Sequence, residues 1–318
     1  MALAMTEISH STYASLEPSL EALVSIKSHV PDDAMSAGLL GTERTGHGIR
    51  VREDGLIVTI GYVINEAEEI WIASHDGRAA PAFVVGNDFQ SGLALIKPMM
   101  PLPGPVIEIG SSRTLGVGDA VRIAGSEESD PQVTEAHVVA KQEFAGRWEY
   151  VLDEAIFTAP PHESWSGAAL LDLSGRLCGV GSLVIQGFEI NEARRTVNMF
   201  VPIDLLMPVI DELCERGRRS TPPRPWLGLL VHDEDDELTV VGVYRNCPAD
   251  KAGLRPGDVV LRVDDQPVHS LAHMFRTVWS LGTAGIDVPL LVLRNSQLEE
   301  ATVKSAERSE FLRKGTVQ

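Results

Sequence analysis

The stretch Glu163-Ser164-Trp165-Ser166-Gly167-Ala168-Ala169-Leu170-Leu171-Asp172 decides how this 318-residue chain is interpreted. It places one serine, Ser166, among small residues directly before a short apolar run. A serine hydroxyl becomes a nucleophile only when a second group takes its proton and a third group orients that base. The function therefore depends on whether the rest of the chain supplies a histidine and an aspartate to this serine.

Residues 21 to 205 consist of short alternating or apolar runs, separated by turn residues at roughly even spacing. This pattern predicts the strands of an all-β sandwich or barrel. The runs are Ala22–Ile26, Gly55–Ile60, Ile70–Ala73, Ala82–Val85, Leu93–Ile96, Ala120–Ala124 and Cys178–Ile185. The Asp76-Gly77 pair between two of these runs predicts a hairpin turn, because such turns need residues that tolerate a positive φ.

The pattern changes after residue 201. Apolar residues recur every three or four positions in Pro202–Cys214, and basic residues follow, so a helix is predicted there. The proline-rich Ser220–Pro225 then predicts a stiff linker and a domain boundary. Beyond it, an amphipathic helix is predicted near Leu271–Leu281 and a strand at Val288–Arg294. Residues Arg308–Gln318 are expected to fray.

The composition excludes several classes of protein. The chain carries 27 basic and 45 acidic residues, a formal net charge of −18, which argues against nucleic acid as a partner because phosphates require basic surface. The same acidity disfavours anionic membranes, and no run approaches the ~18 apolar residues that a membrane-spanning helix needs. With 44% hydrophobic and 23% charged residues, the chain does not have the composition of a disordered or low-complexity protein.

Three scattered cysteines, Cys178, Cys214 and Cys247, form neither a CxxC motif nor a paired set. They predict no zinc site and no disulfide framework, and no other metal or cofactor is expected. Residues 1–8 lack a basic segment followed by a long apolar one, so no secretory signal is predicted. We therefore expect a cytoplasmic protein, or a periplasmic one if a leader has been removed.

Together these motifs resemble the HtrA family over roughly residues 20 to 305. The matching segments are Gly55–Thr59, before the family's catalytic histidine, Asn87–Lys97, around its catalytic aspartate, Ser164–Ala168, at its Gly-Asn-Ser-Gly-Gly loop, and Arg224–Gly228, at its entry into a PDZ domain. The resemblance implies a mainly β fold, in which a trypsin-like double β-barrel precedes an α+β PDZ domain. The implied division is an N-terminal segment 1–19, a protease-fold domain 20–219, a linker 220–225, a PDZ domain 226–306 and a C-terminal tail 307–318.

The departures from the family pattern concern its catalytic residues. The segment expected to read Thr-x-x-His-Val is Thr59-Ile60-Gly61-Tyr62-Val63, so Tyr62 stands at the position of the base. Gly92 stands at the position of the aspartate, and only Ser166 is retained of the three. Ser164 replaces the glycine whose backbone N–H contributes to the family's oxyanion hole.

These replacements remove the chemistry of proton transfer. A tyrosine titrates near pH ~10, so at neutral pH it does not accept the proton of Ser166. Gly92 offers no carboxylate, and the loss of the base alone costs on the order of 10⁶ in turnover in a comparable triad. Ser164 carries a Cβ where a positive φ favours glycine, so the loop is expected to differ in shape. Trp165 either plugs the cleft or forms an apolar wall for a ligand.

Three histidines are candidates to replace the missing base. His47 and His75 are more than a dozen residues from Tyr62, so a shifted alignment does not bring either into register. His162, next to Glu163, is either a rescued base, a metal ligand or an ordinary loop residue, and a lone His-Glu pair is a weak metal signal. We expect the ordinary loop residue, and for Tyr62 a packed aromatic ring with a locally bonded hydroxyl.

The segment Trp226-Leu227-Gly228-Leu229 resembles the carboxylate-binding loop of PDZ domains. In that loop, consecutive backbone N–H groups face the C-terminal carboxylate of a peptide, which is added as a strand beside the helix near Leu271–Leu281. This recognition needs backbone geometry and a hydrophobic pocket, and no catalytic residue. The other interpretation is a purely structural or oligomer-gating domain.

The sequence therefore predicts a catalytically degenerate HtrA-like protein of protein quality control. It would bind peptides, protein C termini or unfolded polypeptide through its PDZ domain and cleft, as an adaptor or as a regulator of an active paralogue. The alternative is an active HtrA-type serine endopeptidase that uses Ser166 with a non-standard base. A third interpretation is a metal-binding pseudoprotease that uses scattered histidines. The family commonly forms trimers, so a homo-oligomer is expected, with residues 10–20, including Tyr13, as the contact.

Overall fold

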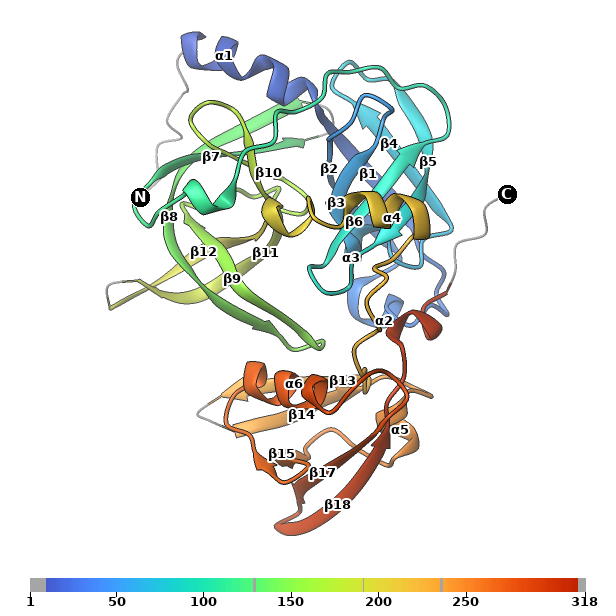
Figure 1. The fold of residues 1–318 in the computed structure, drawn as a ribbon. Coiled ribbons are helices and arrows are strands. Elements are labelled where there is room, and N and C mark those ends of the chain that lie inside the picture. The colour runs from blue at the N-terminus through green and yellow to red at the C-terminus, as the bar shows by residue number, and fades with distance from the viewer. Residues whose placement is uncertain (1–9, 128–129, 191, 235–236, 314–318) are drawn as a thin grey trace.

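The computed structural model describes residues 10–127, 130–190, 192–234 and 237–313. Two closed β-barrels stand side by side, and a third, smaller unit of strands and helices lies below them (Figure 1). The fold is mainly β, as predicted. Among the described residues, no helix is both long enough and apolar enough to cross a membrane.

The first barrel closes in the order β1-β2-β3-β6-β5-β4, and the second in the order β10-β11-β12-β9-β8-β7. All neighbouring strands in both barrels are antiparallel, which lets short turns connect them. The strands of the first barrel are β1 (Leu23–His29), β2 (Glu43–Arg50), β3 (Ile57–Ile60), β4 (Glu69–Ser74), β5 (Ala79–Asn87) and β6 (Leu93–Pro98). Those of the second are β7 (Ala120–Glu127), β8 (Asp130–Gly146), β9 (Tyr150–Ala159), β10 (Ala169–Leu171), β11 (Leu177–Ile190) and β12 (Ala193–Pro202).

The third unit is a sheet in the order β13-β14-β15-β17-β18, with β16 paired to β15 and two helices against it. Its elements are β13 (Leu229–Glu234), β14 (Glu237–Val243), α5 (Pro248–Lys251), β15 (Val259–Val263), β16 (Gln266–Pro267), α6 (Leu271–Ser280), β17 (Asp287–Arg294) and β18 (Gln297–Lys304). The predicted helix and strand of this unit correspond to α6 and β17. Ser270 begins α6 by accepting a hydrogen bond from the His273 backbone, a normal N-terminal cap.

All seven apolar runs proposed as strands lie in or overlap strands, and Asp76-Gly77 makes the turn between β4 and β5. The helix proposed at Pro202–Cys214 is wrong in extent. It is a 3₁₀ turn, η2 (Ile203–Leu205), followed by a separate short helix, α4 (Ile210–Arg216). Pro208 explains the break, because proline lacks the N–H of a helical hydrogen bond and clashes with the preceding turn. Gly217, at φ 72°, ends α4 in the left-handed conformation.

The remaining helices are short and connect or flank the barrels. They are α1 (His10–Glu21), α2 (Ala37–Leu40), α3 (Gly61–Ile64) and two 3₁₀ turns, η1 (Ser112–Thr114) and η3 (Arg308–Glu310). Leu16 and Leu20 of α1 are buried in the main core, and Ser19 Oγ donates to the Gly175 carbonyl at 2.8 Å. This face of α1 therefore packs on its own chain. The trimer contact proposed for residues 10–20 stays a prediction, and the side chain of Tyr13 lies outside the described residues.

The fraying expected from residue 308 onward is wrong for residues 308–313. The Phe311 ring packs on the Trp226 ring with their centroids 5.0 Å apart. Arg313 bonds through a guanidinium nitrogen to Asp33 at 2.6 Å and through its backbone N–H to Glu66 at 3.1 Å. The chain thus leaves the third unit and attaches to the first barrel. Residues 314–318 lie outside the described part.

Candidate functional site

The loop that carries Ser166 lies between the two barrels. The Ser166 carbonyl accepts a hydrogen bond from the His47 backbone of β2 at 2.8 Å, and the Gly167 N–H donates to the Gly181 carbonyl of β11 at 2.8 Å. Gly167 has a φ of 74°, and a Cβ on it would lie 2.0 Å from the His47 carbonyl oxygen. Only glycine satisfies both conditions, so this residue fixes the loop against the first barrel.

The hydroxyl of Ser166 contacts Tyr62, which is carried by α3. The phenol oxygen of Tyr62 lies 3.0 Å from Ser166 Oγ and 2.7 Å from the Ser182 carbonyl oxygen. A carbonyl only accepts hydrogen bonds, so the phenol proton points to Ser182. Ser166 therefore donates its own proton to the phenol oxygen. The hydroxyl of Tyr62 was expected to bond locally, but its two partners belong to β11 and to the Ser166 loop, and neither lies in α3.

The Tyr62 phenol stays protonated over the physiological range. Burial raises the pKa of Tyr62 to about 12, and its hydrogen bonds to the side chains of Ser166 and Trp165 offset this only in part. A neutral phenol accepts a hydrogen bond from a serine without removing its proton. Trp165 is half-buried and its side chain interacts with Tyr62.

Gly92, predicted to stand at the position of the family's aspartate, lies close to the ring of Tyr150. Its φ is 78°, and a Cβ would lie 3.2 Å from the ring of Tyr150. Tyr150 Oη in turn donates to the Ser91 carbonyl at 2.5 Å, which fixes the ring there. The remaining cavity, lined among others by Tyr62, Gly92, Trp148 and Tyr150, has a volume of about 60 Å³. This volume holds a few water molecules.

The backbone N–H of Ser164 is hydrogen-bonded within its own loop. It donates to Nδ1 of His162 at 3.0 Å, while His162 Nε2 donates to the Gln132 carbonyl at 3.1 Å. Burial lowers the pKa of His162, so the ring is neutral with its proton on Nε2. Ser164 does not adopt a positive φ. The loop therefore does not offer this N–H to a substrate oxyanion.

His47 is a residue of this site that sequence reasoning set aside. Its ring Nδ1 lies 3.0 Å from the Ser166 carbonyl oxygen, and the side chain is buried. The contact reaches the backbone of Ser166, whereas the Ser166 hydroxyl bonds to Tyr62. The sequence separation of 119 residues hid this contact. Among the residues that the structure describes, no group of three or more His, Cys, Asp or Glu side chains is arranged to hold a metal ion.

Asp88, four residues before Gly92, is buried in an ion pair. Its carboxylate accepts two hydrogen bonds from the Arg219 guanidinium, at 2.7 and 2.6 Å, and one from the Ser91 hydroxyl at 2.5 Å. Only 1% of the Asp88 side chain is exposed. Arg219 directly precedes the proposed linker 220–225, so this pair attaches the start of that linker to the first barrel.

The predicted carboxylate-binding loop already holds a carboxylate. The N–H groups of Leu227, Gly228 and Leu229 donate to the side chain of Glu149, at distances of 2.6 to 3.1 Å. Trp226 is not one of these donors, because its N–H and carbonyl pair with Ala306. Gly228 has a φ of 85°, the conformation that lets three successive N–H groups converge.

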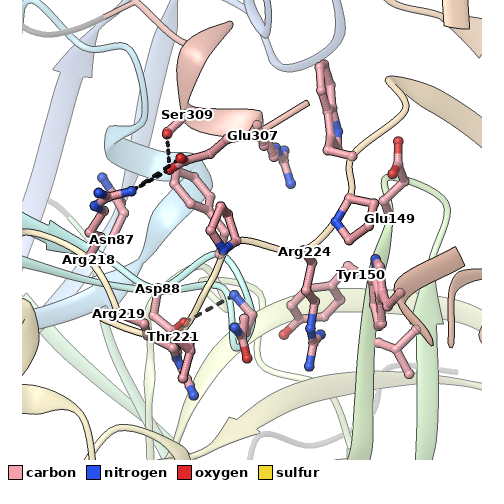
Figure 2. A pocket seen from close by; sticks show the side chains of 18 residues that line it. Asn87, Asp88, Glu149, Tyr150, Arg218, Arg219, Thr221, Arg224, Glu307 and Ser309 are labelled. Carbon is pink, nitrogen blue, oxygen red and sulfur yellow. Dashed lines mark hydrogen bonds and ion pairs between the residues drawn. The ribbon is translucent and has the colours of Figure 1, made fainter. Parts of the chain in front are cut away.

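Glu149 lies at the tip of the β8–β9 hairpin of the second barrel, which reaches down to the C-terminal unit in Figure 1. The Val231 N–H of β13 donates to the Arg147 carbonyl at 3.0 Å. Val151 of β9 is buried in the core of the C-terminal unit. A cavity of about 100 Å³ lies beside these contacts. Figure 2 shows Glu149 and Tyr150 on one side of it and Asn87 and Arg218 on the other.

Sequence reasoning missed Glu149 and the hairpin that carries it. Burial raises the pKa of Glu149 to about 7, and the three N–H groups and the buried Arg308 guanidinium offset this in part. A glutamate in a turn has no local signature of such a role, since its partners lie 78 to 80 residues away. The local feature that distinguishes Glu149 is its positive φ of 62°, which is visible in the structure and not in the sequence.

Comparisons with known proteins agree with this architecture. Residues 46–180 match the family described as a trypsin-like peptidase domain, and residues 225–305 match the PDZ domain family. A probable periplasmic serine endoprotease DegP-like protein of Halomonas elongata is 31% identical over 273 residues, or 81% of this chain and 55% of the relative. A protein of the same description from Chlamydia pneumoniae is 30% identical over 275 residues, or 81% of this chain and 54% of the relative. The chain spans about half the length of these curated relatives.

Solved structures give the same result at the level of the fold. The serine endoprotease from Yersinia pestis is 27% identical, with a TM-score of 0.55 over 95% of this chain and 99% of that chain. The HtrA-type protease AlgW with a tripeptide is 23% identical, with a TM-score of 0.56 over 97% of this chain and 99% of that chain. We conclude that the chain is an HtrA/DegP-like protein, in which a trypsin-like serine protease domain precedes a PDZ domain.

Proposed function

We propose that this HtrA/DegP-like chain lacks proteolytic activity. In this proposal it binds peptides, polypeptide C termini or unfolded segments through its PDZ domain and cleft, as an adaptor or as a regulator of an active paralogue. The observation that carries the loss of activity is the 3.0 Å contact between the Tyr62 phenol and Ser166 Oγ, the atom whose proton a base would have to take. A base must accept that proton, and a buried phenol with a pKa of about 12 does not. The Ser164 N–H bonded to His162 supports the same conclusion, because it removes a donor from the oxyanion site.

Peptide binding is supported by the PDZ domain itself. Three converging N–H groups, at Leu227, Gly228 and Leu229, form a site for a carboxylate, and β13 beside α6 provides a strand for β-augmentation. One of the similar solved structures is described as an HtrA-type protease with a tripeptide, and another as one with a decapeptide. The compartment stays a sequence prediction, and the curated relatives are named as periplasmic.

A fluorophosphonate probe is expected to leave Ser166 unlabelled from pH 7 to pH 10. The folded state holds the Tyr62 proton until about pH 12, two units above the ordinary tyrosine value, so raising the pH to 10 creates no phenolate base. Labelling and casein hydrolysis are measured for the wild-type chain and for Ser166→Ala, with trypsin as the positive control for the probe. The two chains are expected to be indistinguishable at every pH.

Labelling and cleavage that disappear in Ser166→Ala would sink the inactive assignment. That outcome would favour the second candidate function, an active endopeptidase with a non-standard base. The observation in favour of this candidate is the His47 ring, 3.0 Å from the Ser166 carbonyl. A His47→Ala variant then decides it, since loss of the Ser166-dependent labelling identifies His47 as the base.

The 318-residue chain is expected to bind peptides that carry a free C-terminal carboxylate and to reject the same peptides when amidated. Amidation removes the charge that the three N–H groups recognise, and hydrogen bonds to a charged group contribute about 1.5–3 kcal/mol. Calorimetry with a library of decapeptides, each in acid and amide form, measures the difference. If no peptide of the library binds the wild type or the Glu149→Ala variant described below, the PDZ domain has a structural role instead.

A further inference from the structure

The PDZ groove of this chain is occupied by the chain itself. A peptide bound to such a groove presents a terminal carboxylate to the loop and pairs its backbone with the adjoining strand. Both contacts are made here by the β8–β9 hairpin. Glu149 gives its carboxylate to Leu227, Gly228 and Leu229, and Arg147, two residues before it, gives its carbonyl to the N–H of Val231.

The order of these contacts is that of an antiparallel ligand, although residues 147–149 themselves form a turn. The N–H groups of residues 229 and 231 donate to the Glu149 side chain and to the Arg147 carbonyl, respectively. The two segments therefore run in opposite directions. This is the two-residue step of antiparallel pairing. The side chain of Glu149 replaces the terminal carboxylate of a peptide, so an internal turn reproduces the end of a chain.

Neighbouring contacts hold the hairpin between β13 and α6. Arg276, on the exposed side of α6, forms ion pairs with Glu143 of β8 and Asp153 of β9. Val151 is buried in the PDZ core, and the partly buried Ala145, its register partner in the hairpin, packs against that core. One helix of the PDZ domain therefore contacts both strands of the hairpin.

The tip of the hairpin has a backbone conformation that is unfavourable for a free turn. Glu149 has a φ of 62°, which is unfavourable for a residue other than glycine, asparagine or aspartate. Its side chain is buried, and burial raises the pKa of the carboxylate. Strain and desolvation both oppose the docked position, and the ligand-like contacts with the loop compensate for them. Such an occupant is suited to displacement by a competing carboxylate.

We propose that the β8–β9 hairpin is an internal ligand of the PDZ groove, and that a polypeptide C terminus binds in extended form only by displacing Glu149 from the loop. This inference rests on the proposed function for its external ligand. The internal contact itself is tested independently of any peptide. The expected competitor is a free C terminus, because it carries the same carboxylate and adds a backbone that pairs with β13.

The test compares Glu149→Ala and the isosteric Glu149→Gln with wild type in the 318-residue chain. The matched control is Glu154→Gln, a substitution of an exposed glutamate on the same hairpin that pairs with Lys141 at 2.9 Å. The first measurement is hydrogen–deuterium exchange in peptic fragments covering residues 226–232. The loss of charge-assisted bonds is expected to speed exchange at least about tenfold in Glu149→Ala, and less in Glu149→Gln, which retains one acceptor. Wild-type rates are expected in Glu154→Gln.

The second measurement is the affinity for a fluorescein-labelled decapeptide mixture with free C termini and randomised last four positions. Glu149→Ala is expected to bind at least about tenfold more tightly than wild type, because the internal competitor is gone. Faster exchange without peptide binding by any variant supports the internal ligand and refutes the proposed peptide function. Unchanged exchange, or equal peptide affinity in wild type and Glu149→Ala, refutes the internal ligand even if peptides bind. If Glu149→Ala fails to fold, Glu149→Gln decides on the same two readouts.

Discussion

An Asp88→Ala variant is expected to lose about 3–5 kcal/mol of unfolding free energy. The substitution removes a carboxylate that is 1% exposed and leaves the Arg219 guanidinium, bonded to it at 2.6 and 2.7 Å, without a counter-charge. It also leaves the Ser91 hydroxyl without its acceptor. Urea denaturation followed by circular dichroism measures the loss.

Two variants make this measurement specific. Glu154→Ala removes a carboxylate from a surface pair with Lys141 and is expected to cost less than about 1 kcal/mol. The double variant Asp88→Ala/Arg219→Ala removes both charges and is expected to recover part of the loss, as a double-mutant cycle reports. A cost below about 1 kcal/mol for Asp88→Ala would contradict a structural role of this pair.

Gly167→Ala is the second substitution with a large expected effect. The φ of 74° costs an alanine roughly 1–2 kcal/mol. The new Cβ would also lie 2.0 Å from the His47 carbonyl oxygen, and relieving such overpacking costs about 1–3 kcal/mol more. Thermal and urea unfolding are therefore expected to show a loss of about 2–5 kcal/mol, or a chain that does not fold.

Gly77→Ala is the matched control for this prediction. Gly77 has a similar φ of 79°, but a Cβ there meets nothing within 4 Å. It therefore reports the conformational cost alone, and the difference between the two variants measures the packing of the Ser166 loop against β2. Equal losses in the two variants would mean that this loop is free to move away from the first barrel.

Most of the strands and turns could be predicted from the sequence, because they depend on local patterns of apolar and turn-forming residues. Leu93–Ile96 is apolar and bounded by turn residues, and it forms β6. Asp76-Gly77 is a preferred hairpin-turn pair, and it makes the turn between β4 and β5. The error at Pro202–Cys214 is also local in origin. Apolar spacing outweighed Pro208, although a proline in a helix interior removes a hydrogen bond.

The residues of the candidate site also fall into those that local sequence patterns predicted and those that they did not. Tyr62, Gly92 and Ser166 were found by their order in a known pattern, and their chemical properties follow from residue type. His47 and Glu149 were not found, because each acts on residues that only the packing of separate domains or barrels brings near. Glu149 has a further obstacle. Its side chain does what a chain terminus does, and no spacing along a sequence encodes that substitution.

The attachment of residues 308–313 to the first barrel has a consequence for how the PDZ domain moves. The domain is joined to the protease fold at both of its ends, by the linker that enters it and by Arg313 bonded to Asp33 and Glu66 after it leaves. Two tethers keep a released groove close to the hairpin, so rebinding is an intramolecular event at a high effective concentration. A ligand for this groove therefore competes against local return of the hairpin rather than against bulk solvent.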